Sequence, residues 1–126
     1  MPAHASFDYA TLRVVPRVER EEFINVAVIV FCLEKRYLEA RIHLDESRLL
    51  ALFPDVDVEL IRHHLDAIRR ICEGHPTAGP IAQLPLRERF HWLISARSTI
   101  LQPSAVHTGI CTGTEGLLNR LAKQFL

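Results

Sequence analysis

The chain has 126 residues, of which 48% are hydrophobic and 24% charged, and its 15 basic residues balance its 15 acidic ones. This length and composition predict one folded domain, residues 1–126, that needs neither disulfides nor a structural metal. The balanced charge argues against a protein that holds nucleic acid mainly through phosphate contacts, because such proteins carry a surplus of lysine and arginine.

The three cysteines lie far apart, at positions 32, 72 and 111. An odd number of cysteines without a CxxC pair predicts reduced thiols and a cytoplasmic protein. The first residues lack the basic and apolar stretches of a signal peptide. The longest apolar run, residues 23–33, is too short to cross a bilayer, so we expect no membrane role.

Three strands are predicted in the first third of the chain. Residues 7–15 are rich in β-branched and aromatic types and stop at Pro16, which cannot donate to a sheet. Residues 23–33 are almost wholly apolar, which predicts a central strand covered on both faces. Residues 37–44 alternate in polarity, as in a strand with one solvated face. The short links between them predict an antiparallel meander.

Helical periodicity follows. A short helix is expected over residues 45–52, and a longer one over 58–72, where apolar residues recur at spacings of three and four. Asp57 is the expected N-cap of the longer helix, and Gly74 is the residue expected just past its end.

The last third of the chain is predicted to mix a strand with helices. A third helix is expected to begin at Pro85, and residues 98–102 are expected to form a short fourth strand. We expect an irregular loop over 103–111. Residues 112–115, TGTE, match a capping box and predict a last helix from there to the C-terminus. The fold class is therefore α+β, with an antiparallel meander of three strands plus a short fourth packed against about four helices.

Polar side chains concentrate between residues 97 and 115. Exposed amides at a helix N-terminus, beside hydroxyl groups and an imidazole, are typical of an anion site. One interpretation is therefore a phosphate or carboxylate site that includes two arginines from the first strand and its exit. Its candidate ligand-binding residues are Arg97, Ser98, His107, Thr108, Thr112, Arg13 and Arg20. The other interpretation is a polar loop whose serines and threonines bond their own backbone.

Catalytic alternatives are weaker. Cys111 and His107 would serve as nucleophile and base only at a separation of about 3 Å, and no third residue is available to orient them. With His75 or His91 they would supply zinc ligands, but without the paired spacing of zinc sites. The chain contains none of the strong nucleotide, hydrolase or metalloprotease motifs. No metal and no cofactor is predicted, and both an enzymatic and a non-enzymatic role stay open.

One further surface is a candidate for contact with a partner. Tyr37, Arg41 and His43 share the polar side of the third predicted strand. They form either a partner surface or simply the solvent side of the sheet.

Three segments, in this order, carry a family resemblance: YATLRVVPRVEREEFINVAVIVFC, RYLEARI and ERFHWLISARSTILQPSAVHTGIC. Together they resemble the bacterial domain-of-unknown-function family numbered 3037, over nearly the whole chain. No catalytic residues are assigned in that family, so none is carried over. Genes of this family often stand beside one for a kinase-like protein that resembles the persistence-toxin kinases, which implies an accessory or partner role.

Two functions compete. The first is a non-enzymatic protein-interaction module, self-associating as a homodimer and working with a kinase-like partner, because a wholly apolar central strand needs cover on both faces. The alternative is a protein or enzyme that binds a small phosphate or carboxylate ligand through residues 97–114. Convergence of Arg13 or Arg20 with His107 in one pocket would favour the ligand.

Overall fold

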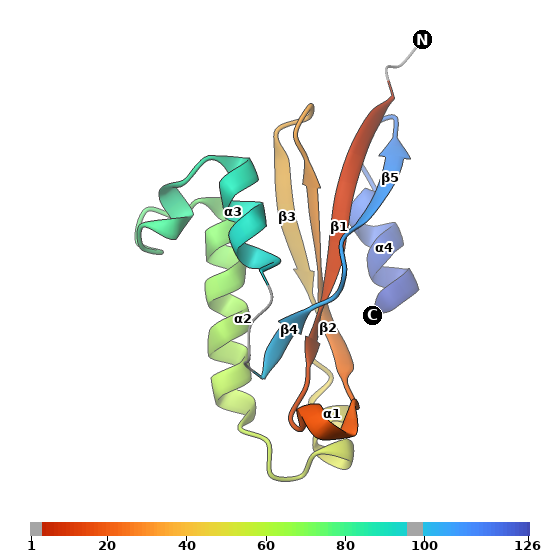
Figure 1. The fold of residues 1–126 in the computed structure, drawn as a ribbon, viewed down its shortest axis with the longest axis vertical. Helices are drawn as coiled ribbons and strands as arrows, with labels where there is room; N and C mark the ends of the chain where they lie inside the picture. Colours follow the sequence, from red (N-terminus) through yellow and green to blue (C-terminus); the bar gives the residue numbers. More distant parts are fainter. Residues whose placement is uncertain (1–3, 96–99) are drawn as a thin grey trace.

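An antiparallel sheet of five strands forms the centre of the computed structural model, which describes residues 4–95 and 100–126 and, of Val18, the backbone alone (Figure 1). Four helices and two short 3-10 turns surround the sheet. The α+β class predicted from the sequence is confirmed, with one strand more than expected.

The predicted meander is present. Strands β1 (Ala5–Val14), β2 (Ile24–Cys32) and β3 (Tyr37–Ile42) pair antiparallel in chain order. The 3-10 turn η1 (Val18–Arg20) lies between β1 and β2. All but one of the β2 residues are buried, because β2 is a central strand with apolar cores on both faces. The exception is Asn25, which is half-buried.

The other side of β1 is bordered by two short strands, β4 (Leu101–Pro103) and β5 (His107–Cys111). Tyr9 lies opposite His107 and Leu12 lies opposite Pro103. The chain therefore advances three residues along β1 but four residues between β4 and β5. The extra residue breaks one edge strand into two halves, as a bulge does.

This geometry corrects the prediction of an irregular loop over 103–111. The loop assignment failed because Pro103 and the inserted residue interrupt the alternation on which strand prediction depends. The short fourth strand expected over 98–102 is found at 101–103, and positions 98 and 99 lie outside the described residues.

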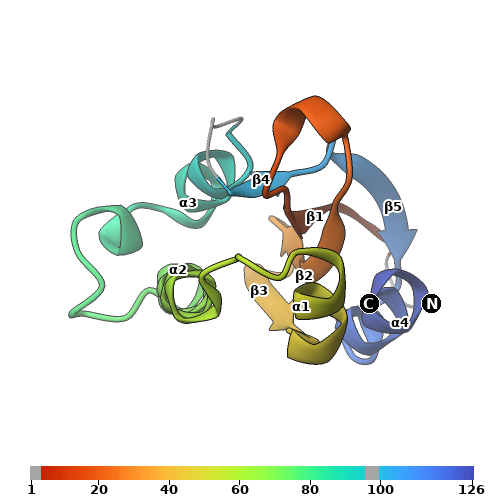
Figure 2. The same cartoon turned by 90° about the horizontal axis from the view of Figure 1, so that it is seen from below.

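The helices cover opposite faces of the sheet. Helices α2 (Val58–Glu73) and α3 (Leu86–Leu93), joined through η2 (Ile81–Gln83), lie on one face, and α4 (Leu117–Phe125) lies on the other (Figure 2). Helix α1 (Glu46–Leu52) packs near one end of the sheet. Within the described part of the chain, no helix has the length and apolar character needed to cross a membrane.

Alternation along β2 divides its side chains between two cores. Ile29 and Phe31 join the larger core against α2 and α3, whereas Val28 and Val30 join the smaller core under α4. Burial of apolar side chains on both faces is what makes this strand continuous in hydrophobic residues.

Aspartates cap both α1 and α2, and the caps predicted for α2 are observed. Asp45 and Asp57 each accept a hydrogen bond from a backbone N–H in the first turn, both at 3.1 Å. Gly74 ends α2 with a φ of 68°, a left-handed conformation that glycine adopts at little cost.

Arg89 in α3 binds the same C-terminal end of α2 that Gly74 closes. Its Nη1 donates to the carbonyl oxygens of Ile71 and Cys72, both at 2.9 Å, and its Nε donates to the carbonyl of Leu84, also at 2.9 Å. The first two are among the last carbonyls of α2, which lack the partner one turn further along the helix, although the carbonyl of Ile71 also accepts the Gly74 N–H at 3.1 Å. One guanidinium therefore joins α2, α3 and the connection between them.

Candidate functional site

The residues predicted to bind a ligand fall in different parts of the molecule. Two of them, Arg97 and Ser98, lie outside the described residues. The others are distributed over β1, η1, β5 and the turn after β5: Arg13, Arg20, His107, Thr108 and Thr112.

His107 and Thr108 point to opposite faces of the sheet, as neighbours on a strand must. The exposed His107 ring packs beside Tyr9, with 5.3 Å between ring centroids. The Thr108 hydroxyl donates to Asp8 Oδ1 at 2.8 Å. The two side chains therefore face different surroundings.

Arg13 lies on the same face of the sheet as His107, but four residues further along β1 than Tyr9, the residue opposite His107. Four residues of a strand span about 13 Å. Arg20 is exposed and forms an ion pair with Glu22 at 2.7 Å. It lines a hollow of about 440 Å³ to which neither Arg13 nor His107 contributes. The convergence that would favour a ligand site at His107 is therefore absent among these residues.

The predicted capping box at residues 112–115 does not form. Helix α4 begins at Leu117, and the residue before it, Gly116, has a φ of 72° and no side-chain cap. The Leu117 N–H donates instead to the carbonyl of Thr114, at 3.2 Å. Thr112 is exposed ahead of this turn, so the amides of 112–114 do not belong to the first turn of a helix.

A Cys111–His107 catalytic pair is also excluded by the strand geometry. The two residues stand at opposite ends of β5, about 13 Å apart, and Cys111 is buried in the core under α4. In the described ranges, no cluster of three or more histidine, cysteine, aspartate or glutamate side chains is placed to hold a metal ion.

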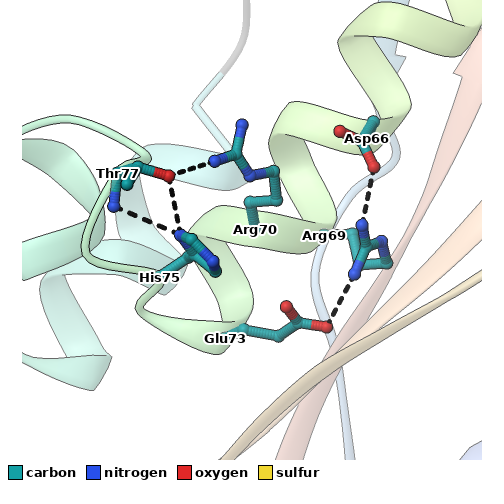
Figure 3. A network of polar contacts seen from close by, with 6 residues as sticks. All are labelled: Asp66, Arg69, Arg70, Glu73, His75 and Thr77. Carbon is teal, nitrogen blue, oxygen red and sulfur yellow. Dashed lines mark hydrogen bonds and ion pairs between the residues drawn. The ribbon is translucent and has the colours of Figure 1, made fainter.

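His75, the other imidazole considered, belongs to a polar network at the end of α2 (Figure 3). Its Nδ1 lies 2.8 Å from the Thr77 hydroxyl, which Arg70 also contacts. Arg69 bridges Asp66 and Glu73 on the same helix. All the ion pairs of this network are exposed, and such pairs contribute little to stability. Its contacts are all local to the end of α2 and the loop that follows.

The outer edge of β5 is open. Thr11 bonds Ser104 through both of its backbone groups, at 2.9 and 2.8 Å, so the odd-numbered residues of β1 face β4 and β5. Because backbone groups alternate along a strand, those of Thr108 and Ile110 point away from β1. Among the described residues, no strand pairs with this side of β5.

The side chains of this edge are uncharged and partly apolar. Thr108 and Ile110 share the face opposite α4, and Ile110 is 72% exposed. Val106, the residue just before β5, is also exposed, at 40%. On the face opposite α4 a hollow of about 170 Å³ lies beside β1, lined by Ser6, Asp8 and residues of β2, the β2–β3 turn and α3. We call Val106, Thr108 and Ile110 the open edge. β-Branched residues at these three alternate positions were the strand signal in this segment, but the signal was too short to outweigh Pro103 and the inserted residue.

A second unusual position lies at the other end of β1, on the α4 side of the sheet. Arg13 is opposite Asn25 of β2 and Gln102 of β4. Its guanidinium carbon stands 4.1 Å from the centroid of the Phe23 ring. Two buried polar atoms here, Arg13 Nε and Asn25 Oδ1, have no hydrogen-bond partner among the described residues.

The polar side of β3 is covered by the chain's own last helix. Arg41 Nη2 donates to Asn119 Oδ1 of α4 at 2.5 Å, and Tyr37 packs beside the core under α4. His43 stays exposed just beyond β3. Much of this surface is therefore occupied from within the molecule.

A model of the family described as protein of unknown function (DUF3037) matches residues 9–126. The chain belongs to this family. The match covers nearly the whole chain and agrees with the resemblance found in its three sequence segments. No curated protein and no solved structure matches the chain.

For this DUF3037 protein, one titration is set by the contacts of β3. Burial, reinforced by the Glu39 carboxylate that accepts its hydroxyl at 3.2 Å, raises the pKa of Tyr37 to about 12. Because the folded pKa is above the ordinary value, the neutral phenol contributes stability below about pH 10, and this contribution is lost as the pH rises toward 12.

We therefore expect a Tyr9→Phe variant, in which Tyr37 is the remaining tyrosine, to show little tyrosinate absorbance at about pH 10. Glu39→Gln should move the midpoint back toward the ordinary value. A half-ionised Tyr37 at pH 10 in the folded protein would contradict the expectation.

Proposed function

We propose that this DUF3037 protein is a non-enzymatic interaction module that forms a homodimer through the open edge of β5. The observation that carries the proposal is Ile110, a large apolar side chain that is 72% exposed on an edge strand. Natural edge strands are usually protected by charged residues, proline or a covering segment. β5 itself, HTGIC, contains neither a charged residue nor a proline.

The edge is complementary to itself. The backbone groups of the even-numbered residues point outward, so two copies of β5 can pair antiparallel about a two-fold axis at Thr108. That register places Ile110 of each copy opposite Val106 of the other. Both side chains are exposed in the single chain, and each would cover the other in the dimer. A two-fold contact of this kind uses the same patch on both copies.

The expected affinity is modest. A strand of five residues buries little area, and contacts below the standard size of a stable interface are weak or transient. The dimer is therefore expected at high micromolar concentration. The three free cysteines are buried, so this association does not depend on a disulfide. We place it in the cytoplasm, where such thiols stay reduced.

Ile110→Asp tests the homodimer. A carboxylate in the contact, on each copy, should raise the dissociation constant about 100-fold or more, because each Ile110 that packs against Val106 of the other copy is replaced by a desolvated charge. Light scattering after size-exclusion chromatography at high micromolar concentration measures it. Leu60→Asp is the matched control. Leu60 is also a large apolar residue, 44% exposed, but it lies in the first turn of α2, away from β5.

A monomeric wild-type protein at that concentration would contradict the homodimer, as would an Ile110→Asp variant that still dimerises. The accessory role beside a kinase-like protein rests on the family resemblance and has its own test. Co-expression of the two proteins should yield a complex that purifies together. Failure to co-purify would contradict the proposal of a kinase-like partner without affecting the proposal of a homodimer.

A further inference from the structure

Arg13 carries a charge that the described protein does not neutralise. Among the described residues, no aspartate or glutamate lies within ion-pair distance of it. What distinguishes Arg13 from the other arginines without an acidic partner is its buried Nε, which has no hydrogen-bond partner in the described part of the chain. Its neighbours across the sheet, Asn25 and Gln102, are both uncharged. The residues directly opposite Arg13 therefore bring no carboxylate to this face.

The guanidinium is also partly removed from water. Its Nε is buried without a hydrogen-bond partner, whereas Arg13 as a whole is only half-buried. A buried donor on a charged group that stays unpaired costs stability, so such groups call for an explanation. Partial removal from water also strengthens the attraction between the charge and an anion at the surface.

Phe23 holds this charge in place. Its ring supports the guanidinium at 4.1 Å, a favourable cation–π distance, and Phe23 is itself 45% exposed. An aromatic ring of this kind orients the planar guanidinium, whose N–H donors match the geometry of carboxylate and phosphate groups. It also accounts for a large aromatic side chain at the surface.

Asn25 gives the position its second polar group. Its Nδ2 donates to the carbonyl of Phe125 in α4 at 3.4 Å, and its Oδ1 is buried and unpaired. The hydrogen bond to α4 ties the residue opposite Arg13 to the helix on this face. The position is therefore built from β1, β2 and α4 together.

We propose that Arg13, supported by Phe23, binds a small oxyanion, either a carboxylate or a phosphate, at this face of the sheet. The anion meets the guanidinium edge that faces solvent and neutralises the unpaired charge. The site lies on the face opposite Ile110 and is independent of the homodimer.

The test is a titration of the full-length protein followed by NMR. Sodium acetate, sodium phosphate and sodium chloride are added to separate samples at matched ionic strength. Acetate or phosphate should shift the Arg13 Nε–H signal and the Phe23 and Asn25 backbone amides, saturating at about millimolar concentration, the range expected of a single-arginine site. Comparison of the two arms identifies the preferred oxyanion, and chloride should give no saturation.

Arg13→Gln should abolish the saturating shifts, and Arg13→Lys, which keeps the charge but loses the fork, should weaken binding at least ~10-fold. Arg120→Gln, an exposed arginine of α4, is the matched control and should titrate as the wild type does. If Arg13→Gln does not fold, the weakened binding expected of Arg13→Lys tests whether Arg13 binds the oxyanion. Shifts that grow linearly without saturation, or that survive in both Arg13 variants, would overturn the proposal.

Discussion

Replacing Arg89 with alanine should lower the free energy of unfolding by about 3 kcal/mol, measured by urea denaturation. The guanidinium donates three hydrogen bonds of 2.9 Å to backbone carbonyls, two of them at the end of α2. Each bond from a charged donor contributes about 1.5–3 kcal/mol, and the loss is not additive because water reaches part of this position. The positive charge also lies at the negative end of the α2 dipole.

Arg87→Ala is the matched control, because Arg87 belongs to the same helix but is exposed. Its effect should stay within about 0.5 kcal/mol. Arg89→Lys should recover part of the loss, since an ammonium keeps the charge but cannot reach all three carbonyls. Equal effects of Arg87→Ala and Arg89→Ala would show that Arg89 does not hold α2 and α3 together.

Replacing Gly109 with valine should cost about 2–3 kcal/mol of stability, because it overfills a packed position. A Cβ at residue 109 would stand 2.5 Å from Cζ and 2.8 Å from Cε1 of Phe7. Phe7 is buried in the core under α4, so its ring cannot move aside freely. The clash would push β5 away from β1, and the homodimer should weaken with it.

Gly113→Ala provides the comparison. A Cβ there would meet nothing within 4 Å, so thermal unfolding should change by no more than a degree or two, equivalent to about 0.5 kcal/mol. If Gly109→Val unfolded at the wild-type temperature, the covering of Gly109 by the Phe7 ring would not be a determinant of the β1–β5 pairing.

The parts of the fold that follow local rules could be predicted from the sequence. The meander has uninterrupted strand patterns and short connections, and α2 has both a regular apolar stripe and recognisable caps at Asp57 and Gly74. In these elements, local preference and tertiary packing act in the same direction.

The parts of the fold that depend on segments far apart in the chain could not be predicted from the sequence. β5 gains its backbone partners from β1, about a hundred residues earlier, and nothing within 103–111 reveals that pairing. The TGTE sequence satisfies the capping pattern, yet Gly116 adopts a left-handed conformation that delays the helix to Leu117. A local motif was outweighed by the path the chain takes to reach the sheet.

The candidate sites show the same division. The sequence could suggest Arg13 and His107 as residue types suited to anions, but which residues share a face depends on strand register. The register places Arg13 beside Asn25 and Gln102, whereas His107 lies opposite Tyr9, about 13 Å from Arg13 along the strand direction. The exposure of Ile110 could not be read from the sequence, because it depends on which edge of β5 the rest of the chain leaves uncovered.

The pairing of β1 with β5 also has a consequence for how the chain folds. Ala5 stands opposite Cys111, so the first strand acquires its second neighbour only when nearly the whole chain is available. Contacts so far apart in sequence form late, after the local meander and helices. During synthesis the N-terminal half of β1 therefore has an unsatisfied edge for most of the time that the nascent chain is growing. Incomplete chains that end before β5 should be the form of this protein most prone to aggregate.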